Sequence, residues 1–234
     1  MRIYSSAELP QHFEDGTANP EWLAMHNQKF TGSNFYVFMS LLKKGELTET
    51  AESVLYEKAL ASIEEPEPTV VTAAMERGTM LESVAREAYM AETFEDVREV
   101  GFVDLEELRA GCSPDGVVWI KRPDLDWDKV SYDEFKQLIK TPIEKIIEIK
   151  CPAAKNYIKM AKGKLPTQYE VQVQYNLFVT GAKSCDFVVY HPAFKLSVQN
   201  IKPDEKMQAD IRAVLEKLNA KYDEILADIK EFRK

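Results

Sequence analysis

Two short stretches of the sequence carry most of the information about its fold: Gly111-Cys112-Ser113-Pro114-Asp115-Gly116 and Ile147-Glu148-Ile149-Lys150-Cys151-Pro152. On a β-strand the side chains of Glu148 and Lys150 leave the same face, and Ile149 between them points the other way, into a core. We expect another strand to bring the carboxylate of Asp115 beside them. Two carboxylates and one ammonium group in such an arrangement can hold a divalent metal ion next to a phosphate.

The rest of the chain alternates between helical and extended patterns, which glycines and prolines interrupt. We expect helices over residues 35–42, 49–63, 72–91, 155–161, 166–180 and 203–232, with a short one over 133–139. Strands are expected over residues 97–103, 112–120, 144–150, 186–190 and 195–201. Pro166 should open its helix at the first turn, and Gly181 should end it. This order predicts an α/β fold with a central mixed β-sheet flanked by helices.

The length of 234 residues is compatible with a single domain over residues 1–234. In this division helices occupy 20–95, the sheet that carries the site occupies 96–201, and a C-terminal helix occupies 203–232. That last helix contains a heptad seam of apolar residues, namely Ile211, Leu215, Leu218, Tyr222, Ile225, Ile229 and Phe232. The seam can dock on the core or pair between subunits. Docking is favoured because a single terminal helix usually covers a sheet.

The charge is distributed unevenly along an acidic chain. A formal net charge of −9 argues against a protein that coats nucleic acid by bulk attraction. A run of lysines nevertheless lies between residues 145 and 164: Lys145, Lys150, Lys155, Lys159, Lys162 and Lys164. This basic run is either the solvated face of a helix or a surface that contacts phosphates, for which Lys155 and Lys159 are the candidates.

Cysteine usage and hydropathy predict a cytoplasmic protein with no membrane partner. The three cysteines, Cys112, Cys151 and Cys185, are odd in number and scattered, as is typical of reduced thiols. No window approaches the roughly 18 consecutive apolar residues that a membrane span needs. The first residues also lack the apolar core of a signal peptide.

The residue types of the two stretches suit hydrolysis of a phosphodiester. This reaction needs an activated water and neutralised phosphate charge, which two divalent ions roughly 3.5–4 Å apart can provide. Asp115, Glu148 and the backbone carbonyl of Ile149 would supply the hard oxygen ligands that Mg²⁺ prefers, and Lys150 would be the cationic partner. Taken alone, Glu-x-Lys on a strand is more often a surface ion pair. The Pro114-Asp115 pair before it and a glutamine-rich helix after it favour a catalytic metal site over a surface ion pair.

These motifs resemble a known family. Pro114-Asp115 followed by Glu148-Ile149-Lys150 matches the PD-(D/E)XK nuclease signature, and the wider context, with Gln172-Val173-Gln174-Tyr175, is similar to the lambda exonuclease (YqaJ-type viral recombinase) family. The resemblance covers most of the chain. It implies a restriction-endonuclease-like core and a Mg²⁺ site with two ions, in which Mn²⁺ substitutes. The implied activity is 5′-to-3′ degradation of one strand from the ends of double-stranded DNA.

The resemblance also assigns residues to roles. Asp115 and Glu148 would bind metal together with Glu82, Lys150 would be the catalytic lysine, and Gln172 would lie near the scissile phosphate. Ser33 and Thr31 would contact a terminal 5′-phosphate. Where the family carries an arginine for that phosphate this chain has His26, and Lys29 is a nearby candidate to replace it.

The resemblance further implies partners and a setting. The partners would be a single-strand annealing protein, which receives the product strand for recombination, and two further copies of the chain in a homotrimer ring. The setting would be a bacterial host cell, with the gene carried by a phage or prophage. Two alternatives stay open: a restriction-like or repair DNA endonuclease with the same two-metal site, and a non-catalytic DNA-binding relative. The second is disfavoured because Asp115, Glu148 and Lys150 are all present.

Overall fold

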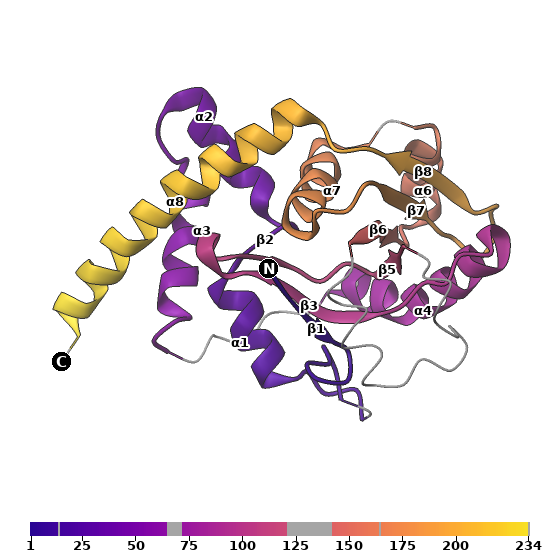
Figure 1. Ribbon diagram of the computed structural model, residues 1–234, viewed down its shortest axis with the longest axis horizontal. Coiled ribbons are helices and arrows are strands. Elements are labelled where there is room, and N and C mark those ends of the chain that lie inside the picture. The colour runs from indigo at the N-terminus through magenta and orange to yellow at the C-terminus, as the bar shows by residue number, and fades with distance from the viewer. Residues whose placement is uncertain (14, 65–71, 121–141, 164, 234) are drawn as a thin grey trace.

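The computed structural model describes residues 1–13, 15–64, 72–120, 142–163 and 165–233 (Figure 1). The strands are β1 (Arg2–Ser5), β2 (Phe30–Thr31), β3 (Val100–Leu105), β4 (Ala110–Cys112), β5 (Gly116–Trp119), β6 (Ile143–Lys150), β7 (Cys185–Val189) and β8 (Ser197–Ile201). The α-helices are α1 (Pro20–Gln28), α2 (Ser40–Lys44), α3 (Glu49–Leu60), α4 (Ala73–Thr93), α6 (Ala154–Ala161), α7 (Thr167–Thr180) and α8 (Glu205–Phe232). Two 3₁₀ helices are η1 (Phe35–Met39) and η2 (Glu106–Leu108). The helix expected over 133–139 lies outside the described residues.

The strands form two mixed four-stranded sheets, with the orders β1-β3-β4-β2 and β5-β6-β7-β8. In the first sheet only β2 and β4 are parallel, and in the second only β6 and β7. An antiparallel bridge between Arg98 and Val117 connects the two sheets through a pair of backbone hydrogen bonds of 2.9 and 2.8 Å. The mixed α/β architecture with flanking helices is confirmed, and the sheet is divided into two halves.

The single strand predicted over residues 112–120 is wrong, because the chain leaves one sheet and enters the other within it. β4 ends at Cys112 and β5 begins at Gly116. Between them Pro114 has no N–H with which to continue a ladder. The Ser113 hydroxyl instead donates to the carbonyl oxygen of Gly101 at 2.9 Å. This break places Asp115 at the junction of the two sheets.

Other differences follow from the same cause, that strand pairing depends on distant partners. The N-terminal strand β1 was not predicted, and it forms because it pairs with β3. The predicted strand over 97–103 is shifted to Val100–Leu105. The helix predicted over 35–42 is divided into η1 and α2, and Pro166 is the residue before α7 rather than its first residue. Gly181 ends α7 with a φ of 65°, as predicted.

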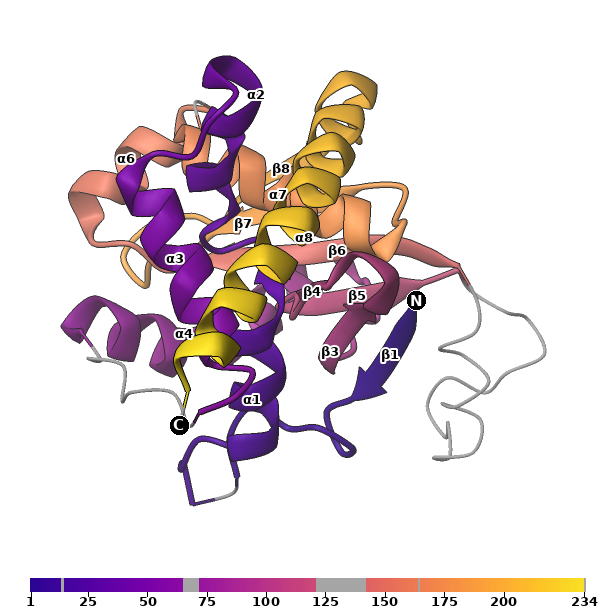
Figure 2. The same ribbon diagram turned by 90° about the vertical axis from the view of Figure 1, so that its left-hand side faces the viewer.

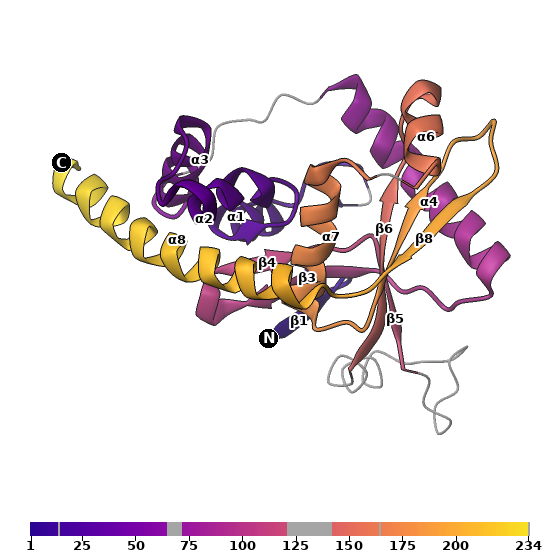
Figure 3. The same ribbon diagram turned by 90° about the horizontal axis from the view of Figure 1, so that it is seen from above.

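Helix α7 lies between the two halves of the molecule. Viewed from above, α1, α2 and α3 gather on one side of α7, and the β5–β8 sheet with α4 and α6 lies on the other (Figure 3). Helix α7 packs against η1, α8, β3 and β4, while α4 packs against β6. Most side chains of α7 are buried, including Tyr175, whose hydroxyl donates to the carbonyl oxygen of Phe30 at 2.6 Å. Helix α7 therefore lies against β4 and β6, the strands at the two stretches around Asp115 and Glu148.

The C-terminal helix docks on the core, as predicted. Figure 2 shows α8 beside α3, and the two helices are in contact. Its buried residues are Ile211, Val214, Leu215, Leu218 and Tyr222. Ile225 and Ile229 of the seam are partly buried and pack against the same core, whereas Phe232 at the end of the helix is 87% exposed. The seam is thus used within the chain up to Ile229.

Among the helices of the described residues, none combines the length and the apolar character that crossing a membrane would require.

Candidate active site

Glu148 is the centre of a buried polar cluster. It lies on β6, which is flanked by β5 and β7, and its side chain is 3% exposed. One carboxylate oxygen accepts hydrogen bonds from the Lys150 ammonium and from Gln172 Nε2, the latter at 2.6 Å. The other oxygen accepts from Asn176 Nδ2 at 3.0 Å. Buried charges need such compensation. The structure thus brings Glu148, Lys150 and Gln172 together.

Asp115 reaches the same place from the junction between β4 and β5. The backbone N–H of Ile149 donates to its Oδ2 at 2.5 Å, which ties the carboxylate to β6 next to Glu148. Burial, followed by the negative charges of Glu148 and Glu82, raises the pKa of Asp115 well above its usual range. A carboxylate in this position is more stable as an anion when an additional cation is present.

Helix α4 contributes a third carboxylate, that of Glu82. Burial raises the pKa of Glu82, although the positive charge of Arg86 opposes the shift. Arg86 lies one turn further along α4 and contacts Glu82 at 2.8 Å, the carbonyl oxygen of Asp115 at 2.8 Å, and Glu99. The guanidinium of Arg86 therefore connects α4 to the junction of the sheets.

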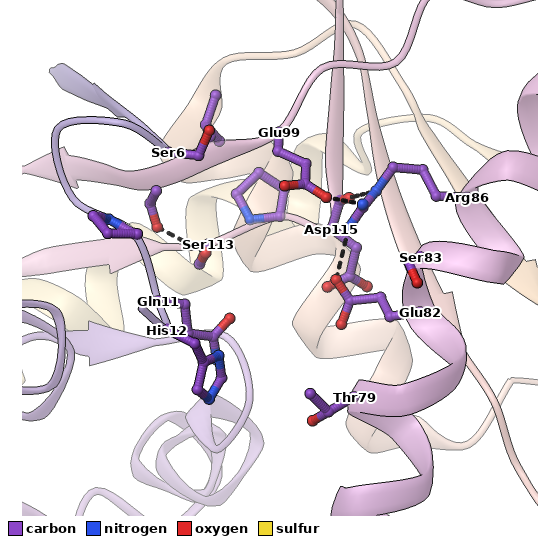
Figure 4. Close-up of a pocket in the computed structure, with 14 residues that line it drawn as sticks. Ser6, Gln11, His12, Thr79, Glu82, Ser83, Arg86, Glu99, Ser113 and Asp115 are labelled. Atoms are coloured by element: carbon purple, nitrogen blue, oxygen red, sulfur yellow. Dashed lines mark hydrogen bonds and ion pairs between the residues drawn. The ribbon is translucent and has the colours of Figure 1, made fainter. Parts of the chain in front are cut away.

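These groups line one side of a cleft of about 300 Å³. In Figure 4 the side chains of α4 face an opposite wall that comes from the segment after β1. Asp115 and Glu99 lie between the two walls. The lining residues labelled there are Ser6, Gln11, His12, Thr79, Glu82, Ser83, Arg86, Glu99, Ser113 and Asp115. The cleft gives solvent and small molecules a route to the carboxylates of Asp115 and Glu82.

Lys150 is held as a cation. Burial of the side chain by itself lowers the pKa of an ammonium, but the carboxylates of Glu148 and Asp115 more than compensate, so that the pKa of Lys150 is raised. The ammonium also lies 5.4 Å from the ring centre of Tyr169 on α7. A permanently charged lysine at this site attracts anions and is unsuited to act as a base at neutral pH.

The donor set fits a hard divalent cation, although the carboxylates are not arranged around an ion. Within the described residues, no group of three or more His, Cys, Asp or Glu side chains has metal-binding geometry. Lys150 and Arg86 neutralise Glu148 and Glu82 instead. The negative charge of Glu148 nevertheless helps to raise the pKa of both Asp115 and Glu82, and carboxylate oxygens are the ligands that Mg²⁺ prefers.

The segment Thr31-Gly32-Ser33 lies directly against α7 at this site. A Cβ atom added to Gly32 would be 2.5 Å from Asn176 Oδ1 and 3.3 Å from the backbone oxygen of Gln172. Thr31 is buried, whereas Ser33 is exposed, and their hydroxyl groups are 3.4 Å apart. The absence of a side chain at Gly32 lets this segment approach the two α7 residues that contact Glu148.

We predict that Gly32→Ala lowers the nuclease activity expected from the sequence about tenfold or more and costs about 1–3 kcal/mol of stability, because overpacking would displace Asn176 and weaken its hydrogen bond to Glu148. Cleavage rates and thermal unfolding of the purified variant measure both effects. Gly78→Ala is the matched control, since a Cβ atom at Gly78, on α4, meets nothing within 4 Å. Equal behaviour of the two variants contradicts the prediction.

The described contacts of the other predicted DNA-binding residues are with groups outside the Glu148 cluster. His26 is half-buried and stacks on Trp22, with 4.8 Å between ring centres. Lys29 forms an ion pair with Asp104 at 2.7 Å. Lys155 and Lys159 are exposed on α6.

The basic run is not one continuous surface. Lys145 is paired with Asp186 at 2.9 Å and with Glu95 at 3.0 Å, and Lys150 is paired with Glu148. Lys162 is exposed after α6, and Lys164 lies outside the described residues. Among the described lysines of the run, Lys155, Lys159 and Lys162 are therefore the ones exposed to contact phosphates.

Sequence reasoning missed Asn176, Arg86 and Tyr169 as members of the site. Asn176 follows Gln172 by four residues and Arg86 follows Glu82 by four, so each pair shares one face of a helix. That spacing could have identified Asn176 and Arg86 from the sequence. No sequence pattern could have identified Tyr169, because its contact with Lys150 depends on how α7 crosses β6.

Comparison with known proteins identifies the family. The model of the YqaJ-like viral recombinase domain matches residues 21–183, more than half of the chain. The chain belongs to this family. The family resemblance expected from Asp115, Glu148 and Lys150 is thereby confirmed. No curated protein matches the chain.

Solved structures similar to this YqaJ-like chain include an alkaline exonuclease, LHK-Exo, from Laribacter hongkongensis. It has 26% sequence identity and a TM-score of 0.67, over 92% of this chain and 100% of that one. A second structure of LHK-Exo, in complex with dAMP, has 26% identity and a TM-score of 0.71, over 91% and 97% of the two chains. A phage-related exonuclease from Haemophilus somnus 129PT shares the fold at 16% identity, with a TM-score of 0.57 over 86% and 96%.

Proposed function

We propose that this YqaJ-family protein is a metal-dependent 5′-to-3′ exonuclease that acts on double-stranded DNA and generates single strands for phage-type recombination. One observation carries the proposal: Glu148 on β6 is buried among Lys150 of the same strand and Gln172 and Asp115, which come from distant segments. The similarity to the alkaline exonuclease LHK-Exo, one structure of which is a complex with dAMP, supports the same reaction.

Asp115, Glu148 and Glu82 would hold a pair of Mg²⁺ or Mn²⁺ ions, and the backbone carbonyl of Ile149 would supply a further oxygen ligand. Bound divalent ions would supply positive charge that offsets the charge developing on the phosphate. Lys150, held as a cation, would attract the scissile phosphate and orient the attacking water. Gln172, whose amide donates to Glu148 at 2.6 Å, would lie beside the phosphate.

The wider setting is part of the proposal. Substrate ends would be bound near Thr31 and Ser33, with Lys155 and Lys159 of α6 contacting the duplex. A homotrimer ring would keep an acidic protein on DNA, because only its channel needs to be basic. The product strand would pass to a single-strand annealing protein in the cytoplasm of a bacterial host. We also propose that residues 1–234 form a single nuclease domain.

The test is digestion of linear duplexes and of a closed circular duplex, with Mg²⁺ and with a chelator in its place. We expect the linear duplex to release mononucleotides from its 5′-labelled end only with Mg²⁺, and the closed circle to survive. Cutting of the circle would support the restriction-like or repair endonuclease alternative. Absence of any cleavage with Mg²⁺ or Mn²⁺ would overturn the proposal in favour of a non-catalytic DNA-binding protein.

A further inference from the structure

Arg86 is a largely buried cation at the edge of the carboxylate cluster. It lies on α4, and its side chain is 13% exposed. The guanidinium donates to Glu82 Oε1 at 2.8 Å, to the backbone oxygen of Asp115 at 2.8 Å, and to the carboxylate of Glu99 (Figure 4). A guanidinium has five N–H donors in a fixed fork and is always protonated in proteins. Because a buried charge is costly when it is unpaired, Arg86 needs a carboxylate beside it at all times.

Glu99 is the partner of this guanidinium to which the proposed metal site assigns no role. It stands directly before β3, next to the Arg98–Val117 bridge that joins the two sheets. Its side chain is 53% exposed and lines the same cleft as Asp115. An ion pair so open to solvent contributes little to folding. A role in the site accounts better for the position of Glu99 beside Arg86.

A metal ion and Arg86 would compete for the carboxylate of Glu82. Burial raises the pKa of Glu82, and the positive charge of Arg86 is the strongest influence that opposes this shift. A divalent ion bound to the same carboxylate would displace the guanidinium, whose charge would then lose one of its partners. Glu99 offsets this loss, because it can keep the guanidinium paired while Glu82 turns to the ion.

We propose that Glu99 is a positioning residue that retains Arg86 when Glu82 binds a metal ion, an inference that rests on the proposed metal-dependent nuclease function. Glu99 would contact neither the ion nor the DNA. The guanidinium would stay on Glu99 and on the carbonyl oxygen of Asp115, which keeps α4 at the junction of the two sheets. The affinity of the site for the ion would then depend on a carboxylate that is not a ligand.

The experiment measures Mn²⁺ binding to the DNA-free protein by isothermal titration. In Glu99→Gln, the carboxylate left to Arg86 among the described residues is that of Glu82, so the guanidinium competes more strongly with the ion. We expect the Kd for Mn²⁺ to rise about threefold to fivefold with the same number of ions bound, as for loss of a partly exposed ion pair. Glu92→Gln is the matched control, because Glu92 is an exposed glutamate on α4 and the substitution removes the same charge.

Cleavage of a linear duplex at increasing Mn²⁺ concentration is the second measurement. The half-saturating Mn²⁺ concentration of Glu99→Gln should rise by the same factor as the Kd. The rate at saturating Mn²⁺ should approach that of the intact protein, because Glu99 acts on the affinity for the ion and not on the bond that breaks. A lowered rate at saturating Mn²⁺ with an unchanged half-saturating concentration overturns the role of Glu99.

A double-mutant cycle tests whether Glu99 acts through Arg86 or directly on the ion. In an Arg86→Met background, Glu99→Gln should change the Kd for Mn²⁺ by no more than about twofold, which is the range of additive behaviour. An equally large effect in both backgrounds overturns the proposal. Should Arg86→Met not fold, Arg86→Lys is the second background, because an ammonium lacks the planar fork that reaches several acceptors. An undiminished effect of Glu99→Gln there likewise overturns the proposal.

Failure of the proposed function gives a different result from failure of the role of Glu99. If the intact protein neither binds Mn²⁺ nor cleaves DNA with it, the proposed function fails. If it does both and Glu99→Gln binds Mn²⁺ with unchanged affinity, only the role of Glu99 is overturned. Loss of a bound ion in Glu99→Gln would make Glu99 a metal ligand, which also overturns its role as a positioning residue.

Discussion

Glu148→Gln is expected to lower the rate of metal-dependent DNA cleavage by roughly 10³-fold, the size of effect that follows loss of a central electrostatic group in an active site. The substitution keeps the shape of the side chain and one acceptor oxygen for Asn176 or Gln172. It removes the negative charge that would hold a metal ion with Asp115. The loss should therefore appear in magnesium binding as well as in activity.

Isothermal titration with Mg²⁺ and cleavage of a linear duplex measure the two effects of Glu148→Gln. Glu144→Gln is a matched control on the same strand, because the Glu144 side chain is 43% exposed and forms a surface ion pair with Lys183 at 2.7 Å. We expect that control to change activity little, since surface ion pairs contribute about 0–1 kcal/mol. Unchanged magnesium affinity in Glu148→Gln would remove Glu148 from the metal site.

Lys150→Met should abolish cleavage in a different way, lowering its rate by about 10²–10³-fold while DNA binding persists. The ammonium of Lys150 neutralises Glu148 in the structure. A bound divalent ion would neutralise the same carboxylate. Without this ammonium, Asp115 and Glu148 repel each other with less compensation. A divalent ion should therefore stabilise the folded Lys150→Met variant more than it stabilises the intact protein.

Thermal unfolding with and without Mg²⁺ measures this gain, because a ligand that binds only the folded state raises the melting temperature. We expect a larger increase for Lys150→Met than for the intact protein or for Lys183→Met, a control at an exposed lysine. Gel-shift binding to duplex DNA with Ca²⁺ in place of Mg²⁺ checks that the substrate is still bound. Retention of full cleavage by Lys150→Met would show that Lys150 is not catalytic.

Local patterns in the sequence determined the elements around the site. Alternation along a strand is enough to place Glu148 and Lys150 on one face, because successive side chains of a strand point in opposite directions. Apolar periodicity likewise predicted α4, α7 and α8, and Gly181 marked the end of α7. These features depend only on residues close together in the chain.

Tertiary structure alone decided which distant groups meet. The division into two sheets at Pro114, the pairing of β1 with β3, and the contacts of Arg86 with Glu99 and Asp115 all join segments whose separation leaves no local signal. The charge state around α1 is also a tertiary property. Lys29 is neutralised by Asp104, 75 residues away, and Lys58 loses solvent because α3 packs over the start of β2. Periodicity fixes the face on which a side chain lies, whereas long-range packing selects its partner and removes its water.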